Sequence, residues 1–227
     1  FNATGGDLQW SMFSGDDDMT TPAVDESRAY YYDGTALVTY DTATGARLSS
    51  TIDPYNPGWG YSHHGAPMLG LEDSVTTFSG GAFSGRASSS VEQAGTRPLI
   101  NFSVANNEVR WRTARTYRTQ PATAKGIVYA GSNTPKSFDA IDEATGQVLW
   151  SWVPPPSDPS FHRKVVVTDG LVFVSTDRAI YALGRTARQA VWSYPTPGMM
   201  AISGSGTLYI VEGAMEPTGR LIAISLK

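Results

Sequence analysis

The segment Phe138–Trp150, FDAIDEATGQVLW, alternates apolar and polar residues on both sides of a short polar turn. Alternation with a period of two residues is typical of a half-buried β-strand. Asp142 and Gly146 bound the turn, because Asp accepts hydrogen bonds from the backbone just ahead and Gly adopts positive φ. The segment therefore predicts two antiparallel strands joined by a tight turn, the second ending at Trp150.

The same strand–turn–strand pattern recurs along the chain, in Phe1–Trp10, Val38–Ser50, Asn101–Trp111 and Ile180–Trp192. Trp111 to Trp150 is 39 residues, Trp150 to Trp192 is 42, and Trp10 to Ser50 is 40. A fixed period of about forty residues indicates a repeat architecture. Ser50 to Trp111 is 61 residues, so the second unit carries an insertion of about twenty, to which we assign the Gly/Ser-rich run 78–90.

A second alternating run precedes each of these units. Three of these runs contain dipeptides that favour hairpin turns: Asp33-Gly34, Asp169-Gly170 and Ser205-Gly206. Each unit thus supplies about four short strands, and no segment shows a helical period. The sequence predicts an all-β fold, a β-propeller of about five four-stranded blades in one domain, residues 1–227. The predicted blades are 19–52, 62–113, 117–153, 162–194, and 198–227 together with 1–13.

The two ends of the chain are complementary. The C-terminal run GRLIAISLK lacks the turn and the Trp strand, and the N-terminal run FNATGGDLQW is a turn and a Trp strand. We expect the N- and C-terminal strands to pair in one blade and close the ring, which would remove an exposed sheet edge.

The repeated pattern of apolar strand, Asp, Thr-Gly, strand and Trp resembles the PQQ-like repeat of the quinoprotein-like β-propellers. AIDEATGQVLW carries the resemblance most fully, YDTATGARLSS lacks the Trp, and YALGRTARQAVW has a degenerate turn. On this resemblance the repeated residues have an architectural role, with each Trp fixing one blade to the next. They are Trp10, Asp41, Gly45, Trp111, Asp142, Gly146, Trp150 and Trp192.

The resemblance implies two kinds of function. Members that oxidise alcohols or sugars use pyrroloquinoline quinone, Ca²⁺ and a catalytic Asp, usually on seven or eight blades. Non-enzymatic relatives include periplasmic scaffolds for outer-membrane protein assembly, typically with eight blades. Many of the alcohol-oxidising members carry an adjacent-cysteine disulfide against the cofactor, whereas this chain has no cysteine. The count of about five blades departs from both patterns. The repeat serves enzymes and non-enzymes alike, so it predicts a fold more than a function.

Composition narrows the function classes. The net charge is −4 and charged residues are 17% of the chain, which argues against a nucleic-acid surface. No apolar run approaches the roughly 18 residues of a membrane helix. Without cysteine there is no disulfide and no thiolate metal site. The chain begins at Phe1, which is consistent with a mature form after removal of a signal peptide or with an excised piece. We expect a periplasmic or secreted location.

In propellers of this type, the residues just before each innermost strand surround one mouth of the central channel. All three histidines of the chain fall at such positions. The predicted ligand-binding residues are His63, His64, Arg118, Gln120, His162, Arg163 and Thr21, with Trp59 and Tyr61 in an adjoining aromatic loop that begins at Asp53. A rim of this kind suits an anionic or polyhydroxylated ligand, a glycan or a protein partner. The alternative is a water-filled channel whose lining residues only form hydrogen bonds with backbone groups.

No metal site is predicted. Adjacent histidines in an extended segment point in opposite directions, so His63 and His64 are poorly placed to share one ion with His162. The run Gly15–Met19, GDDDM, lacks the spacing of a dedicated calcium loop. We therefore predict an extracytoplasmic, non-catalytic ligand-binding or protein-interaction module without a cofactor or membrane insertion. The alternative is an enzyme that uses the funnel, either an oxidoreductase with pyrroloquinoline quinone and calcium or a carbohydrate-active lyase or hydrolase.

Overall fold

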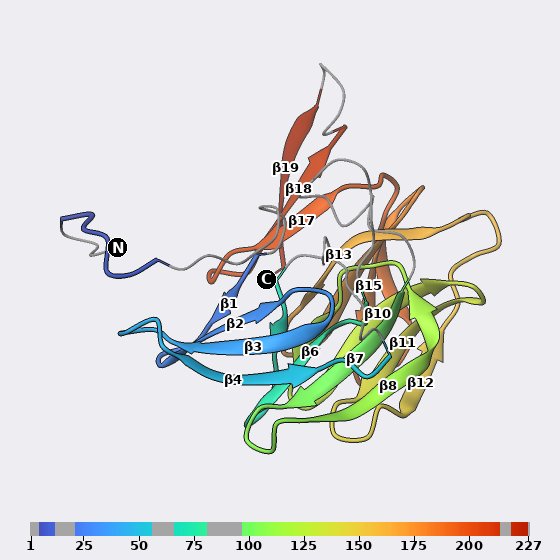
Figure 1. The fold of residues 1–227 in the computed structure, drawn as a ribbon. Coiled ribbons are helices and arrows are strands. Elements are labelled where there is room, and N and C mark those ends of the chain that lie inside the picture. The colour runs from blue at the N-terminus through green and yellow to red at the C-terminus, as the bar shows by residue number, and fades with distance from the viewer. Residues whose placement is uncertain (1–4, 12–20, 56–65, 81–96, 214–218, 227) are drawn as a thin grey trace. The chain divides into compact units, whose positions relative to one another are not determined.

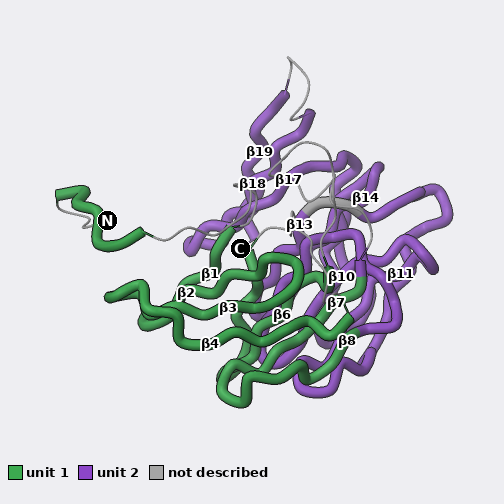
Figure 2. The backbone as a smooth tube through the Cα atoms, in the orientation of Figure 1, with its two compact units in different colours: residues 1–94, 98–112 green, residues 95–97, 113–227 purple. Residues whose placement is uncertain are grey.

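A computed structural model describes residues 5–11, 21–55, 66–80, 97–213 and 219–226, except for the side chains of His162 and Arg163. Every regular element in these ranges is a β-strand, and the strands form five antiparallel sheets (Figure 1). The chain divides into two compact units, residues 1–94 with 98–112 and residues 95–97 with 113–227 (Figure 2).

The first unit contains two four-stranded sheets whose strands follow the chain order. The first sheet is β1 (Ala23–Val24), β2 (Arg28–Tyr32), β3 (Ala36–Asp41) and β4 (Arg47–Ile52). The second is β5 (Met68–Leu69), β6 (Ser74–Phe78), β7 (Arg97–Ser103) and β8 (Glu108–Tyr117), and β8 continues into the second unit.

The second unit contains three further sheets. They are β9 (Ala122–Ala124), β10 (Ile127–Asn133), β11 (Lys136–Asp142) and β12 (Val148–Trp152); β13 (Phe161–Val167), β14 (Leu171–Thr176), β15 (Ile180–Gly184) and β16 (Ala190–Tyr194); and β17 (Met199–Ile202), β18 (Thr207–Glu212) and β19 (Arg220–Ser225). The last sheet has three strands among the described residues.

Closure of the ring by residues 1–13 and the organisation of the chain as one domain stay predictions.

The sheets of the second unit pack face to face, and β14 shows how the alternation produces this. Val172 and Val174 are buried against Tyr129 and Phe138 of the β9–β12 sheet. Phe173, on the opposite face of the same strand, is buried against the β17–β19 sheet. Since successive side chains of a strand point to opposite faces, one strand contributes to two cores. The strand β13 also lies against both β9 and β17, so the first strands of the three sheets are neighbours.

In the first unit, one core lies between the two sheets. It contains Tyr30, Tyr32 and Leu37 of the first sheet, Val75, Ile100 and Phe102 of the second, and Val104 of the turn after β7. All seven are buried. The packing of two apolar faces, rather than any one hydrogen bond, therefore holds these sheets together.

The turn before each fourth strand is the most regular local feature of the chain. In the turn 142–146, Asp142 Oδ1 accepts hydrogen bonds from Thr145 N and Thr145 Oγ1, both at 2.8 Å. Gly146 N donates to Asp142 O at 2.8 Å, and Gly146 has φ 73°. The turn 41–45 repeats these bonds, and Gly45 has φ 70°.

Two turns that lack the Asp–Gly pair also have positive φ at the fifth position. Asn107 and Arg188 have φ 52° and 56° at the position of Gly146. Arg188 N donates to Gly184 O at 2.7 Å, as Gly146 N does to Asp142 O. Non-glycine residues seldom adopt positive φ, so the shape of the turn is retained where its favoured residues are not.

The strand register corrects one position of the predicted repeat. Trp150 pairs with Ala140 and Trp192 pairs with Ala182, each beside a bulge in the ladder. In the first sheet the residue at the equivalent place beside the bulge is Ser49, which pairs with Thr39. Ser49, and not Ser50, therefore occupies the tryptophan position of that sheet, eight residues after Asp41 as Trp150 lies eight residues after Asp142.

The turn 41–45 binds the side chain of Trp10. Its indole Nε1 donates to Thr42 O at 2.8 Å. A Cβ added to Gly45 would lie 2.7 Å from Cδ2 of the Trp10 ring. The indole is thus in contact with the backbone of the turn, and the absence of a side chain at Gly45 makes room for it. We call residues 41–45 with this indole the Trp10 socket.

We expect Gly45→Ala to destabilise the first unit more than Gly6→Ala. Both glycines have φ near 70°, but a Cβ at Gly6 has nothing within 4 Å. The backbone strain, about 1 kcal/mol, is common to both variants. Only Gly45→Ala adds a clash with the indole, for a total loss of about 2–4 kcal/mol in the free energy of unfolding. Urea unfolding measures the difference, and equal losses would show that the indole does not occupy the turn.

Candidate functional site

The structure describes some of the predicted mouth residues and not others. His63, His64, Trp59 and Tyr61 lie outside the described residues, as do the side chains of His162 and Arg163. Thr21 is exposed just before β1 in the first unit. Arg118 and Gln120 lie between β8 and β9 in the second unit. The funnel as a whole stays a prediction.

Part of the predicted rim comes together in the second unit. Gln120 and Lys164 form a parallel backbone bridge, and Val165 N donates to Gln120 O at 3.0 Å. Arg118 N donates to Gly131 O at 2.7 Å, which fixes the approach to β9. The backbones that carry Gln120 and Arg163 are therefore adjacent, because Arg163 immediately precedes Lys164. His162 pairs with Ser175, so it lies within β13 rather than ahead of it.

The side-chain oxygen of Gln120 is in an unusual environment. This atom, Oε1, is buried and has no hydrogen-bond partner among the described residues. A buried polar atom without a partner costs free energy and marks a place for a water or a ligand group. The atom makes Gln120 the predicted rim residue with the strongest structural indication of a polar guest.

Three buried carboxylates lie at the centres of polar networks that the sequence did not single out as sites. Asp139 is fully buried and accepts hydrogen bonds from Arg115 Nη1 at 2.6 Å, Tyr117 OH at 2.9 Å and Ser151 Oγ at 2.7 Å. Burial, and then the charge of Asp139, raises the pKa of Tyr117. The tyrosine stays a neutral donor that stabilises the carboxylate.

Asp158, also in the second unit, is buried and hydrogen-bonded in a similar way. Its Oδ2 accepts hydrogen bonds from Thr176 Oγ1 and Tyr181 OH, both at 2.8 Å. Its backbone carbonyl accepts a hydrogen bond from Lys136 Nζ. Burial and the bond to Asp158 raise the pKa of Tyr181 to about 12. Asp158 therefore connects the 153–160 loop to β14 and β15.

Asp53 is the carboxylate of the predicted aromatic loop, and it points into the first unit. It is fully buried, and its Oδ2 accepts hydrogen bonds from Tyr32 OH and Ser79 Oγ, both at 2.8 Å. Tyr55 is exposed, with the Arg112 guanidinium 4.6 Å from its ring centroid. Asp53 is thus unavailable to a ligand, whereas Tyr55 offers an accessible ring.

These networks serve the fold. Each buried carboxylate is held by neutral hydroxyls or an arginine, and hydrogen bonding of this kind offsets the cost of burying the charge. Tyr–Asp pairs of this type were missed because the partners are 21 residues apart for Tyr32 and Asp53 and 22 for Tyr117 and Asp139. Only the packed sheets bring such residues together.

The described residues do not fit a quinone–calcium site. They contain no group of three or more His, Asp or Glu residues placed to hold a metal ion. A calcium ion takes six to eight oxygen ligands, and the buried carboxylates are already engaged one by one. No reaction step through pyrroloquinoline quinone follows from these residues.

Comparison with known proteins gives the family. A family model described as "Outer membrane protein assembly factor BamB" matches residues 102–227, more than half of the chain. The chain belongs to this family. A comparison with curated proteins finds no match. The BamB match confirms the predicted resemblance to PQQ-like β-propellers.

Two solved structures show the same fold. BamB from Moraxella catarrhalis is 17% identical with a TM-score of 0.57, over 86% of this chain and 56% of that one. A europium-containing methanol dehydrogenase is 11% identical with a TM-score of 0.61, over 85% of this chain and 51% of that one. The all-β propeller fold is thereby confirmed. The chain spans about half the length of these structures. Among its described residues, none forms a helix able to cross a membrane.

We expect Asp139→Ala to lower the free energy of unfolding by about 3 kcal/mol, because it leaves Arg115 and the Tyr117 hydroxyl without their acceptor. Asp169→Ala is the matched control. Asp169 forms an ion pair with Lys125 at 2.7 Å, but both side chains are largely exposed, at 91% and 67%. Exposed pairs contribute little, so the urea midpoint should not change. Equal effects of the two variants would contradict a structural role for the Asp139 network.

Proposed function

We propose that this chain is a non-catalytic module that binds polypeptide, in the periplasm, during the assembly of outer-membrane proteins. The observation that carries the proposal is the match of residues 102–227 to the BamB family model. The likeness to methanol dehydrogenase concerns the fold alone, so it does not favour an oxidoreductase. Of the predicted partners, we therefore favour a protein over a glycan or a small anionic ligand.

The outer strands of the second unit support this proposal. β12 and β16 are edge strands, each paired with one neighbour among the described residues. They carry exposed apolar side chains: Leu149 is 48% exposed and Val191 is 54% exposed. An edge strand offers unpaired N–H and C=O groups to an incoming extended chain, and apolar side chains beside that edge add affinity.

The carboxylates also support a non-catalytic module. Asp53, Asp139 and Asp158 are each engaged by hydroxyl or guanidinium donors in the interior. A general base must reach a substrate proton, which these groups do not do. The proposal includes no cofactor. The alternative of an enzyme that uses the funnel stays a prediction, either as an oxidoreductase with pyrroloquinoline quinone and calcium or as a carbohydrate-active lyase or hydrolase using His63, His64, Arg118 or His162.

We expect Val191→Lys to weaken binding of a fluorescent peptide taken from a membrane strand of an outer-membrane β-barrel, by about tenfold in the dissociation constant. A charge on the edge strand β16 disfavours pairing with an apolar segment. Fluorescence anisotropy with the full chain measures the change.

Val211→Lys is the control for that experiment. Val211 is 38% exposed, but it lies in β18, whose two edges are both paired. It should leave the affinity unchanged. Absence of binding by the unaltered chain, or an equal loss in both variants, would contradict recognition at the edge strand.

A further inference from the structure

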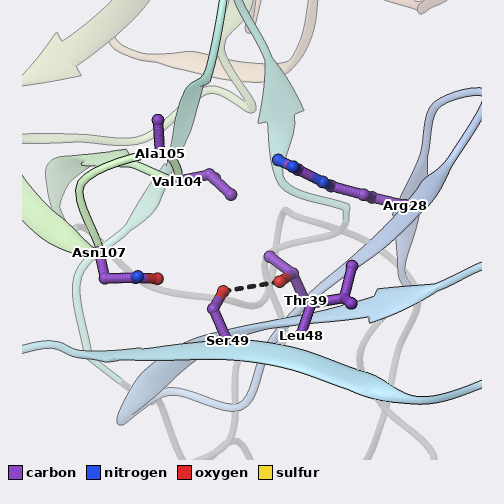
Figure 3. Close-up of a pocket in the computed structure, with 7 residues that line it drawn as sticks. All are labelled: Arg28, Thr39, Leu48, Ser49, Val104, Ala105 and Asn107. Atoms are coloured by element: carbon purple, nitrogen blue, oxygen red, sulfur yellow. Dashed lines mark hydrogen bonds between the residues drawn. The ribbon is translucent and has the colours of Figure 1, made fainter.

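A cavity of about 190 Å³ lies within the first unit. One wall comes from β3 and β4, and the other from the turn between β7 and β8 (Figure 3). The two walls contain Thr39, Leu48 and Ser49 and, across from them, Val104, Ala105 and Asn107. Thr39 Oγ1 and Ser49 Oγ share a hydrogen bond of 2.6 Å at the base of the first wall.

The cavity occurs where other sheets have a tryptophan. Ser49 pairs with Thr39 beside a bulge, as Trp150 pairs with Ala140 and Trp192 with Ala182. Trp150 packs against a buried cluster, with its ring centroid 6.1 Å from that of Tyr129. A serine side chain cannot occupy the volume of an indole, so this position leaves space.

The opposite wall is a turn at the position equivalent to that of the Trp10 socket. In the turn 41–45, the indole of Trp10 contacts Gly45 and donates to Thr42 O. Asp41 and Ser103 are equivalent first residues of their turns, since each precedes by eight the residue at the tryptophan position. Val104 then corresponds to Thr42. Asn107, with φ 52°, corresponds to Gly45, with φ 70°, but Asn107 has a side chain, which lines the cavity where Gly45 leaves room for the indole of Trp10.

We propose that this cavity, the Ser49 cavity, binds the side chain of a tryptophan supplied by a partner polypeptide. The N-terminal segment of this same chain already delivers an indole to an equivalent turn, at Trp10. The volume is suitable, because a cavity of about 150 Å³ in another protein accommodates benzene. The guanidinium of Arg28 completes the lining, and arginine packs favourably on an indole face. The polypeptide source of the ring rests on the proposed function, whereas the affinity for the ring itself does not.

The test is a titration of the ¹⁵N-labelled full chain with N-acetyl-tryptophanamide, followed in ¹H–¹⁵N spectra. We expect saturable shifts at the amides of Ser49, Val104, Ala105 and Asn107, with a dissociation constant on the order of 1 mM for a single ring. N-acetyl-leucinamide is the control ligand and should shift these amides at least tenfold less. Shifts that are absent, or equal for the two ligands, would overturn the proposal.

Three variants test whether the ring enters the cavity. Ser49→Trp fills the position from within the chain, so it should abolish the shifts and raise the thermal midpoint by roughly 3 °C. Ser49→Leu fills it partly, should weaken the shifts, and provides the test if Ser49→Trp does not fold. Ser49→Ala removes the bond to Thr39 but leaves the space, so binding should persist. Undiminished binding by a folded Ser49→Trp or Ser49→Leu variant would overturn the assignment.

Two further ligands identify the source of the ring. The peptide Ala-Trp-Ala should bind at least threefold more tightly than indole, because its backbone can contact the exposed edge of β4. Equal affinity would overturn the polypeptide source in favour of a free aromatic compound. The outcome is separable from the proposed function, since Val191→Lys lies in the second unit and leaves the Ser49 cavity unaltered.

Discussion

One local interaction recurs in four of the sheets, the turn in which the residue at the end of the third strand accepts a hydrogen bond from the backbone just ahead of it, through its side chain or, at Gly184, through its backbone carbonyl. Asp41 and Asp142 do this with a carboxylate, and Ser103 Oγ accepts a bond from Asn106 N at 3.3 Å. The positive φ four residues later completes the turn. Because the turn has a fixed length, the residue eight positions after its start always lies at the same place in the fourth strand. The sequence repeat therefore produces sheets with the same local structure.

A turn of this kind can also bind an aromatic ring. Trp10 occupies one such face through a hydrogen bond and close contact with Gly45. In the first sheet the residue that would supply the next ring is Ser49, and a cavity lies opposite it. One substitution in a repeated position thus changes a structural contact into a candidate recognition site, while the surrounding turn keeps its shape.

The sequence was sufficient for features that a few neighbouring residues determine. The hairpins at Asp33-Gly34 and Ser205-Gly206, and the turn at Asp142, follow from side chains that bond their own backbone or adopt positive φ. The tryptophan position of the first sheet was predicted at Ser50, one residue too late, because that unit has no tryptophan to mark it; the spacing of eight residues from Asp41 gives Ser49. The networks around Asp53 and Asp139 depend on packing between distant strands, and the funnel depends on segments that local patterns do not place.

The turn 41–45 binds the indole of the preceding Trp10 through the Thr42 carbonyl. The most direct measurement is hydrogen exchange of the Trp10 indole N–H, observed by NMR in the ¹⁵N-labelled full chain. A proton held between the indole nitrogen and Thr42 O, 2.8 Å apart, is protected by the free energy of opening that contact. We expect exchange at least about tenfold slower than in N-acetyl-tryptophanamide. Exchange at the rate of the free compound would contradict it.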